Sequence, residues 1–231
     1  MNRNKWILAF SCVAFIIVCF VFIYFLGEQK TSALRLPDKY KMSADDTLGK
    51  KEEKLVQKYI STIDKDADGI DDQTDILENV ISYINTEPKY KSRYYDTGYP
   101  DDGYGVCTDV VAFALLGAGY DLKLLVQQDI SAKSAEYGIE KPDENIDFRR
   151  VKNLKIFFEH TAIPLTTDIN AVEEWQGGDI VIFKKHIGIV SDRRNERGVP
   201  YIIHHDSPRQ KRYEQDILEQ RKDIVGHYRI S

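Results

Sequence analysis

The stretch GGDIVIFKKHIGIV, residues 177–190, contains two short runs of β-branched and aromatic residues with a pair of lysines between them. Runs of this length and composition, bounded by turn residues, predict strands over 179–183 and 186–190 with a tight connection. YIIHH (201–205) and GHYRI (226–230) have the same character further along the chain. The last third of the sequence therefore predicts a sheet of short strands.

Helical patterns come before these strands. The run TDVVAFALLG (108–117) is almost wholly apolar and is followed by turn-forming residues, which predicts a buried helix. Apolar residues spaced by four predict helices over 51–63 and 76–86, and further helices are expected at 121–135 and 150–160. Because helices come first and strands later, we expect an α+β fold with an antiparallel sheet.

A transmembrane helix is expected near the N-terminus, because residues 7–26 carry no charge and are numerous enough to cross a bilayer. The alternative, a cleaved signal peptide, has a shorter apolar core, whereas bulky residues continue here to Leu26. Residues 1–6 would then be a cytoplasmic tail and 27–50 a polar tether. Basic residues flank both ends of the span and do not orient it. The net charge of −5 excludes a broad nucleic-acid-binding surface.

The acidic stretch DKDADGIDDQTD, residues 64–75, separates the first two expected helices. Its acids fall at loop positions 1, 3, 5, 9 and 12 and Gly69 takes position 6, which is the spacing of an EF-hand-type calcium loop. An aspartate replaces the usual glutamate at position 12, and the alternative is a solvated acidic linker. We expect a helix–loop–helix over 51–88 with a structural calcium ion. The expected ligands are Asp64, Asp66, Asp68, the Ile70 carbonyl, Asp72 and Asp75.

Cys107 is the one cysteine outside the apolar span, which holds Cys12 and Cys19. It directly precedes the apolar helix expected at 108–117. A helix N-terminus and a neighbouring imidazolium both lower the pKa of a thiol, so this position suits a nucleophile. The alternative is a small buried packing residue.

Histidines follow in the predicted strands. His186 opens HIGIV, and His204 and His205 end YIIHH. Adjacent strand residues face opposite ways, so one of these last two faces His186. The pattern favours a thiol with a histidine base and a third polar group that orients the base. A metal site formed by the histidines with Asp206 is the alternative.

In this order, GVCTDVV, GGDIVIFKKHIGIV and YIIHH resemble the NlpC/p-sixty group of papain-like bacterial cysteine peptidases, over roughly residues 90–231. The resemblance implies a hydrolase domain over 89–231, in which Cys107 is the nucleophile, His186 the base and His204 the orienting residue. It also implies a structural role for Asp179 and an oxyanion-binding tyrosine before the cysteine. The candidate tyrosines are Tyr95 and, as rivals, Tyr94 and Tyr99.

Details such as GYPDD, GYDL and the closing GHYR further resemble a family of uncharacterised bacterial envelope proteins. The implied activity is that of a membrane-anchored, extracytoplasmic amidase or endopeptidase that acts on cell-wall peptides, with no cofactor for catalysis. Peptidoglycan would be the partner, and such a substrate places the C-terminal domain outside the membrane. The alternatives are an acyl or amide transferase on the same fold and a non-catalytic, calcium-stabilised binding module.

Charged residues near the predicted site raise two further questions. Asp109 lies close to the thiol and raises its pKa unless the acid points away or pairs with a cation. Arg149 and Arg150 are candidates for bidentate binding of a substrate carboxylate. The alternative for both arginines is a solvated helix start.

Overall fold

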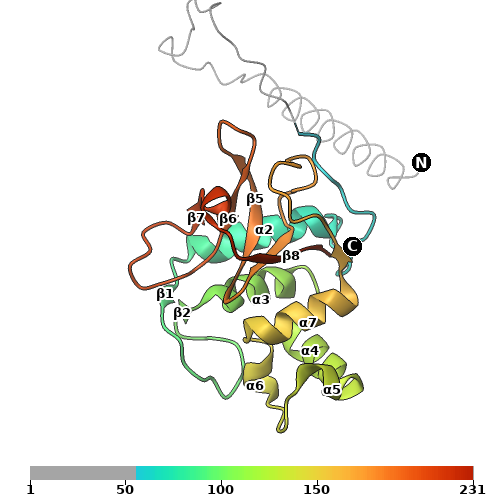
Figure 1. Ribbon diagram of the computed structural model, residues 1–231. Helices are drawn as coiled ribbons and strands as arrows, with labels where there is room; N and C mark the ends of the chain where they lie inside the picture. The colour runs from blue at the N-terminus through green and yellow to red at the C-terminus, as the bar shows by residue number, and fades with distance from the viewer. Residues whose placement is uncertain (1–55, 231) are drawn as a thin grey trace, which may run out of the picture. The chain divides into compact units, whose positions relative to one another are not determined.

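The computed structural model describes residues 56–230, which belong to one compact unit (Figure 1). The predicted span 7–26 and the tether lie outside the described residues. Within 56–230, no helix combines the length and hydropathy needed to cross a bilayer. The helices are α2 (Asp72–Asn85), α3 (Cys107–Gly117), α4 (Leu122–Ala132), α5 (Ser134–Tyr137), α6 (Glu144–Asp147), α7 (Val151–Thr161) and the 3₁₀ helix η2 (Leu218–Gln220).

Short strands form one antiparallel sheet of six, in the order β3-β8-β4-β5-β6-β7, and a separate parallel pair, β1 and β2. This confirms the predicted α+β class with an antiparallel sheet. The strands are β1 (Lys89–Tyr90), β2 (Tyr104–Gly105), β3 (Ile163–Pro164), β4 (Ile180–Phe183), β5 (His186–Arg194), β6 (Pro200–Ile203), β7 (Glu214–Gln215) and β8 (Ile224–Arg229).

The stretch GGDIVIFKKHIGIV folds into the β4–β5 hairpin as predicted. Phe183 pairs with His186 across the turn, so the hairpin places the histidine at the end of the sheet. Gly188 lets β6 approach closely, because a Cβ there would lie 2.6 Å from Ile202 Cγ2 and 3.2 Å from His204 Cβ. Gly188 therefore allows His204, which directly follows β6, to approach His186 at the start of β5.

The helices at 108–117, 121–135 and 150–160 are confirmed as α3, α4 with α5, and α7. The first predicted helix is wrong in its described part, because residues 56–63 contain no helix. Instead the backbone amides of this segment make local hydrogen bonds: Ser61 donates to the Asp71 carboxylate at 2.9 Å, and Ile63 donates to the Ser61 hydroxyl oxygen at 3.0 Å. Asp71 caps α2, which begins at Asp72 inside the predicted calcium loop.

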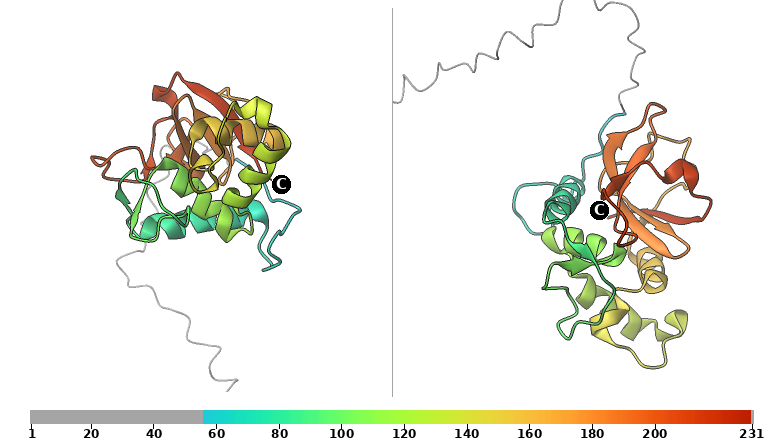
Figure 2. Two further views of the ribbon diagram at one scale, coloured as in Figure 1. Left: turned by 90° about the horizontal axis from the view of Figure 1, so that it is seen from below. Right: turned by 90° about the vertical axis from the view of Figure 1, so that its left-hand side faces the viewer.

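A boundary at residue 88 is also absent from the structure, because α2 packs against α3 and β5 within the same compact unit. Figure 2 (right) shows α2 and α3 together on one side of the sheet. The segment before residue 89 is therefore part of the domain that carries Cys107.

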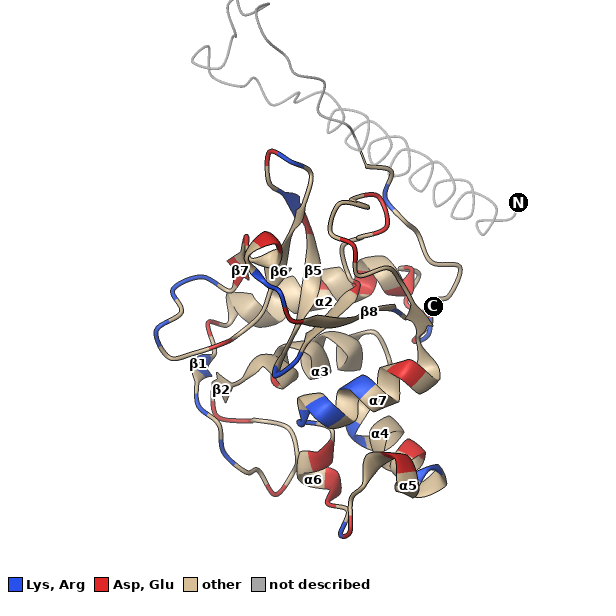
Figure 3. Ribbon diagram, viewed as in Figure 1, with Lys and Arg blue, Asp and Glu red and all other residues tan. Residues whose placement is uncertain are grey.

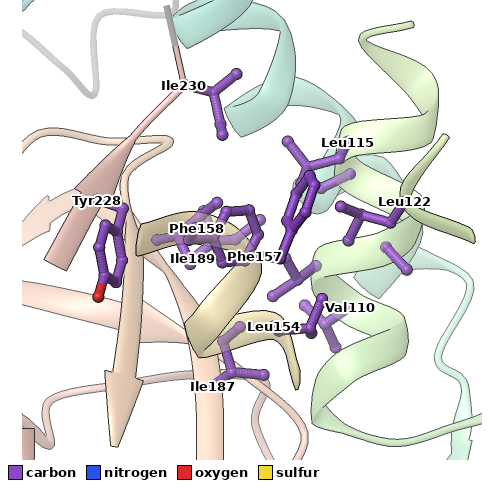
Figure 4. Packing of buried hydrophobic residues seen from close by; sticks show 14 of the residues in the cluster. Val110, Leu115, Leu122, Leu154, Phe157, Phe158, Ile187, Ile189, Tyr228 and Ile230 are labelled. Atoms are coloured by element: carbon purple, nitrogen blue, oxygen red, sulfur yellow. The ribbon is translucent and has the colours of Figure 1, made fainter. Parts of the chain in front are cut away.

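Both faces of β4 are buried. Ile180 and Ile182 belong to the main core between the sheet and the helices, whereas Val181 and Phe183 belong to a smaller core on the other face. Figure 4 shows the main core, where Val110 of α3 packs near Ile187 of β5. Alternate residues of a strand point to opposite faces, so this continuous apolar run is the signature of a strand covered on both sides.

A buried carboxylate ties α2 to the sheet. Asp179, at the entry to β4, is fully buried. It accepts hydrogen bonds from Gln73 Nε2 of α2 and from the Gln176 backbone amide. Two β8 side chains also contact it: His227 Nε2 at 3.0 Å and Arg229, which donates from Nε at 2.7 Å and Nη2 at 2.8 Å. This matches the structural role implied for Asp179.

We expect Asp179→Ala to lower the free energy of unfolding by about 3–5 kcal/mol, because it leaves the buried Arg229 without its counter-ion. Urea unfolding followed by circular dichroism measures the change. Glu196→Ala is the matched control, since Glu196 is exposed and we expect a change below about 0.5 kcal/mol there. Equal stability of the two variants would contradict the role given to Asp179.

Candidate active site

Cys107 is the first residue of α3 and is partly exposed. Burial raises the pKa of its thiol to about 11, the nearby Asp109 charge adds to the rise, and the backbone amides of Ile187 and Thr108 oppose it. The Ile187 contact places the thiol beside the start of β5. The thiol is therefore protonated at neutral pH and needs a base to become a nucleophile.

Asp109 is held by a cation. Arg149 donates to it from Nε at 2.6 Å and from Nη2 at 2.9 Å, and both side chains are almost fully buried. The carboxylate also accepts the Val106 backbone amide at 2.8 Å and so caps α3. The charge of Asp109 near the thiol is thus neutralised by an ion pair. This is the second of the two arrangements expected from the sequence, in which Asp109 either points away from the thiol or pairs with a cation.

Of the two arginines predicted to bind a substrate carboxylate, Arg149 is committed to other partners, so the prediction is wrong for Arg149. Arg149 is used by Asp109 and by the Arg93 carbonyl, to which its Nη1 donates at 2.8 Å. Arg150 is exposed and lies 3.6 Å from Asp147 in an ion pair one turn away. Folding therefore removes Arg149 as a ligand for a substrate, whereas a role of the exposed Arg150 in substrate binding stays a prediction.

Three side chains form a row of hydrogen bonds behind His186. His204 Nε2 lies 2.9 Å from Gln215 Oε1, and His186 Nε2 lies 2.9 Å from His204 Nδ1. An amide oxygen only accepts, so His204 donates from Nε2 and accepts at Nδ1. His186 then carries its proton on Nε2, and its Nδ1 keeps a lone pair.

Burial lowers the pKa of both His186 and His204 to about 4, with their mutual repulsion the second cause for His186. Both rings are therefore neutral at pH 7. Asp206 Oδ1 lies 3.5 Å from His186 Nδ1 and opposes this shift. A neutral imidazole with a free lone pair and a carboxylate beside it is suited to accept a proton.

His205 faces away from this row. Its ring contacts Tyr90 and Tyr213 edge to face, with centroids 5.3 Å and 5.2 Å apart, and its Nδ1 is buried without a hydrogen-bond partner in the described chain. The structure thus brings His204, and not His205, to His186. Within residues 56–230, the clustered acids and histidines that could hold a metal are Asp64, Asp66 and Asp68, so the histidine metal alternative finds no support.

Tyr90 is the tyrosine that the structure places near the thiol. Burial raises the pKa of its hydroxyl, and the Cys107 and Asp206 charges are the next causes. Tyr90 pairs with Gly105 through β1 and β2, two residues before Cys107. Sequence reasoning missed it because β1 lies farther from the cysteine along the chain than the family spacing suggests. The alternation of Tyr90 with lysines was the available signal.

The tyrosines expected from the resemblance have other partners. The Tyr95 hydroxyl donates to Asp102 Oδ1 at 2.8 Å, and the ring lies under the guanidinium groups of Arg93 and Arg149. The rival hydroxyls of Tyr94 and Tyr99 donate to Asp143 and Asp121. Tyr95 is therefore one of the side chains that pack against the Arg149 guanidinium.

The acidic loop is partly assembled as predicted. Oxygens of Asp64, Asp66 and Asp68 lie within 4.8 Å of one another. Asp64 accepts the backbone amides of Asp68 at 3.1 Å and Gly69 at 3.0 Å, which curls the loop. Ile70 donates its amide to Asp68, and the structure gives no separate contact for its carbonyl.

The last two predicted calcium ligands lie on α2. Asp72 is buried, accepts the Lys65 amide at 2.8 Å and accepts the Tyr120 hydroxyl, so it does not join the cluster. This part of the prediction is wrong because a tertiary contact claims the side chain. Burial raises the pKa of Asp75 to about 6, and the charges of Asp68 and Asp66 add to the rise.

Fold and site together define an α+β domain in which a helix-borne cysteine lies against an antiparallel sheet that carries a hydrogen-bonded histidine pair. The chain belongs to the family described as Domain of unknown function (DUF1287), whose profile matches residues 77–230. It is similar to the "Uncharacterized protein YijF" of Escherichia coli (strain K12), with 37% identity over 161 residues that cover 66% of this chain and 77% of YijF. No solved structure matches. The predicted membership of an uncharacterised family is confirmed.

Arg149→Met tests the buried pair. We expect a loss of about 3–5 kcal/mol of stability, because Asp109 remains buried without a counter-ion. The alkylation rate of Cys107 should also fall at a given pH, since the unpaired charge raises the thiol pKa further. Urea unfolding and iodoacetamide kinetics measure the two effects. Arg150→Met, which removes an exposed arginine, should change neither.

Proposed function

We propose that the protein is a cysteine hydrolase of papain-like fold that cleaves amide bonds in cell-wall peptides. The observation that carries the proposal is the hydrogen-bonded row Gln215–His204–His186 at the start of β5, the strand whose Ile187 amide contacts the Cys107 thiol. His186 has an unprotonated Nδ1 and directly precedes Ile187. Nucleophilic catalysis by cysteine requires such a base close to the thiol. The order of the motifs along the chain, and their resemblance to the NlpC/p-sixty group, supports the same assignment.

The proposed reaction uses these groups in sequence. His186 Nδ1 takes the thiol proton while Cys107 Sγ attacks the carbonyl carbon, and Asp206 stabilises the imidazolium that forms. Backbone amides at the start of α3 and the Tyr90 hydroxyl stabilise the oxyanion. His186 returns the proton to the leaving amine, which departs and leaves a thioester. Water, deprotonated by His186, then attacks the thioester carbonyl. The C–S bond breaks, Cys107 Sγ takes back the proton from His186, and a carboxylic acid is released.

Full-length protein incubated with purified peptidoglycan tests the proposal, with products separated by liquid chromatography and identified by mass spectrometry. We expect new peptide termini with the wild type and none with Cys107→Ala. Identical product profiles for the two proteins, alongside an active control hydrolase, would refute a hydrolase acting on this substrate. Products joined to an added amine would instead favour the transferase alternative.

His204 is proposed as a positioning residue, and two substitutions separate that role from simple packing. His204→Leu removes the acceptor for His186 Nε2, so we expect kcat/KM to fall roughly 10²-fold or more. His204→Asn offers an amide oxygen to the same proton and should retain much of the activity. Equal losses of activity in the two His204 variants would contradict the positioning role.

The activity of the wild type should decline below pH 5 as His186, whose pKa is lowered to about 4 by burial, becomes protonated.

We also propose that the loop 64–75 binds Ca²⁺ through Asp64, Asp66, Asp68 and Asp75, with a structural role. The clustered carboxylates and the raised pKa of Asp75 support this, because a divalent cation relieves their mutual repulsion. The site would hold residues 64–70 against α2. It takes no part in the proposed reaction.

Asp75→Asn tests this site through pH and metal together. Its raised pKa makes native Asp75 bind protons more tightly than the unfolded chain, so without Ca²⁺ stability should fall by about 2 kcal/mol as pH rises from 4 to 6. At pH 7 without Ca²⁺ the variant should therefore be more stable than the wild type. Millimolar Ca²⁺ should reverse the order, because only the wild type gains binding energy. Thermal unfolding with Ca²⁺ or EGTA measures both, and an unchanged order would contradict the proposal.

A further inference from the structure

Three basic segments, distant in sequence, border the candidate thiol. The first flanks Tyr90 on and after β1, the second is the β4–β5 turn directly before His186, and the third is the loop between His205 and Tyr213. We call their exposed cations the basic rim. Its residues are Lys89, Lys91, Lys184, Lys185, Arg209, Lys211 and Arg212.

Contacts between neighbours of these residues bring the segments together. The Tyr213 hydroxyl donates to the Pro88 carbonyl at 2.9 Å, which fixes the third segment beside the first. The Tyr90 ring contacts His205, which immediately precedes the third segment, and the Tyr90 hydroxyl lies near Cys107. The β4–β5 turn ends at His186, whose ring is hydrogen-bonded to His204. All three segments therefore meet around the thiol.

The cations of the rim are not neutralised by ion pairs with described acidic residues, a property they share with single exposed lysines such as Lys141 and Lys222. No member of the rim forms an ion pair with a described acidic residue, whereas Lys155, Arg197 and Arg221 pair with carboxylates elsewhere. Figure 3 shows blue along the segment that carries β1 and along the loop before β7. This local excess of positive charge occurs in a chain whose net charge is −5. Carboxylates close to the rim are Asp206, which lies beside His186, Glu87, which lies near Tyr213, and Asp223, which accepts the backbone amide of Lys184.

We propose that the basic rim binds anionic groups on either side of the amide that Cys107 attacks, so that the substrate is a polyanion. The shared chemistry is that of carboxylate or phosphate oxygens, which lysine and arginine bind by charge-assisted hydrogen bonds. Cations that form no ion pair also raise the local concentration of anions and their association rate. This inference rests on the proposed function, because it takes Cys107 as the reacting group.

Alkylation of Cys107 in the full-length protein by two reagents of similar size tests the rim without turnover. Iodoacetate is an anion and iodoacetamide is neutral. We expect the ratio of their rate constants to exceed the ratio for free cysteine roughly 3–10-fold at low salt. In 1 M NaCl, where the screening length is about 3 Å, the ratio should fall to that of free cysteine.

Charge reversal assigns the effect to the rim. Lys91→Glu and Lys211→Glu should each lower the ratio, and the double variant should lower it further. Lys141→Glu makes the same charge change on the exposed loop between α5 and α6 and should leave the ratio unchanged. A wild-type ratio equal to that of free cysteine at low salt, or an equal effect of Lys141→Glu, would overturn the proposal.

Calorimetric titration with poly-L-glutamate and with inorganic polyphosphate identifies the anion. Binding of either polymer, weakened at least tenfold in the Lys91→Glu, Lys211→Glu double variant, supports the rim and assigns the carboxylate or phosphate source. Binding of neither polymer at millimolar concentration would overturn it. A normal reagent ratio with intact peptidoglycan cleavage would refute the rim alone. A raised ratio without cleavage in the wild type would leave the rim standing and refute the hydrolase.

Discussion

The buried ion pair between Asp109 and Arg149 is the contact on which the site depends. It joins α3 to the segment before α7 and, through the Arg93 carbonyl, to the chain that follows β1. Asp109 also caps the helix that begins with Cys107, so one carboxylate sets both the start of α3 and its attachment. A charge of this kind is tolerated in the interior only because its partner is bidentate and its remaining lone pair accepts a backbone amide.

The second constraint is the low polarity around the reacting groups. Burial pushes the pKa of Cys107 up and that of His186 down, so the resting pair is a neutral thiol and a neutral imidazole. A pre-formed thiolate–imidazolium pair would need more solvation than these positions provide. The proposed chemistry therefore couples proton transfer to attack, and Gln215 matters because it sets the tautomer of both histidines through His204.

Sequence reasoning succeeded where a local pattern had a single physical solution. The alternating and continuous apolar runs in the last third could only be buried strands, and the two-lysine turn set their register. It failed at residues 51–63, where apolar spacing of four is compatible with a helix. The described part, 56–63, has no regular secondary structure and contacts Asp71 and Gln176 instead. It failed again at Arg149 and Asp72, whose partners lie 40 and 48 residues away along the chain.

The sequence alone determined the α+β class, the helix next to Cys107, and the presence of His186 and His204 at the ends of two successive strands, because these follow from periodicity and residue type within a few positions. Only the tertiary structure decided that His204 and not His205 meets His186, that Arg149 neutralises Asp109, and that Tyr90 lies near the thiol. The reason is that strand register, the orientation of a ring and the pairing of buried charges are set by packing between segments distant in sequence. No local pattern records which of several chemically equivalent side chains will find itself within hydrogen-bonding distance.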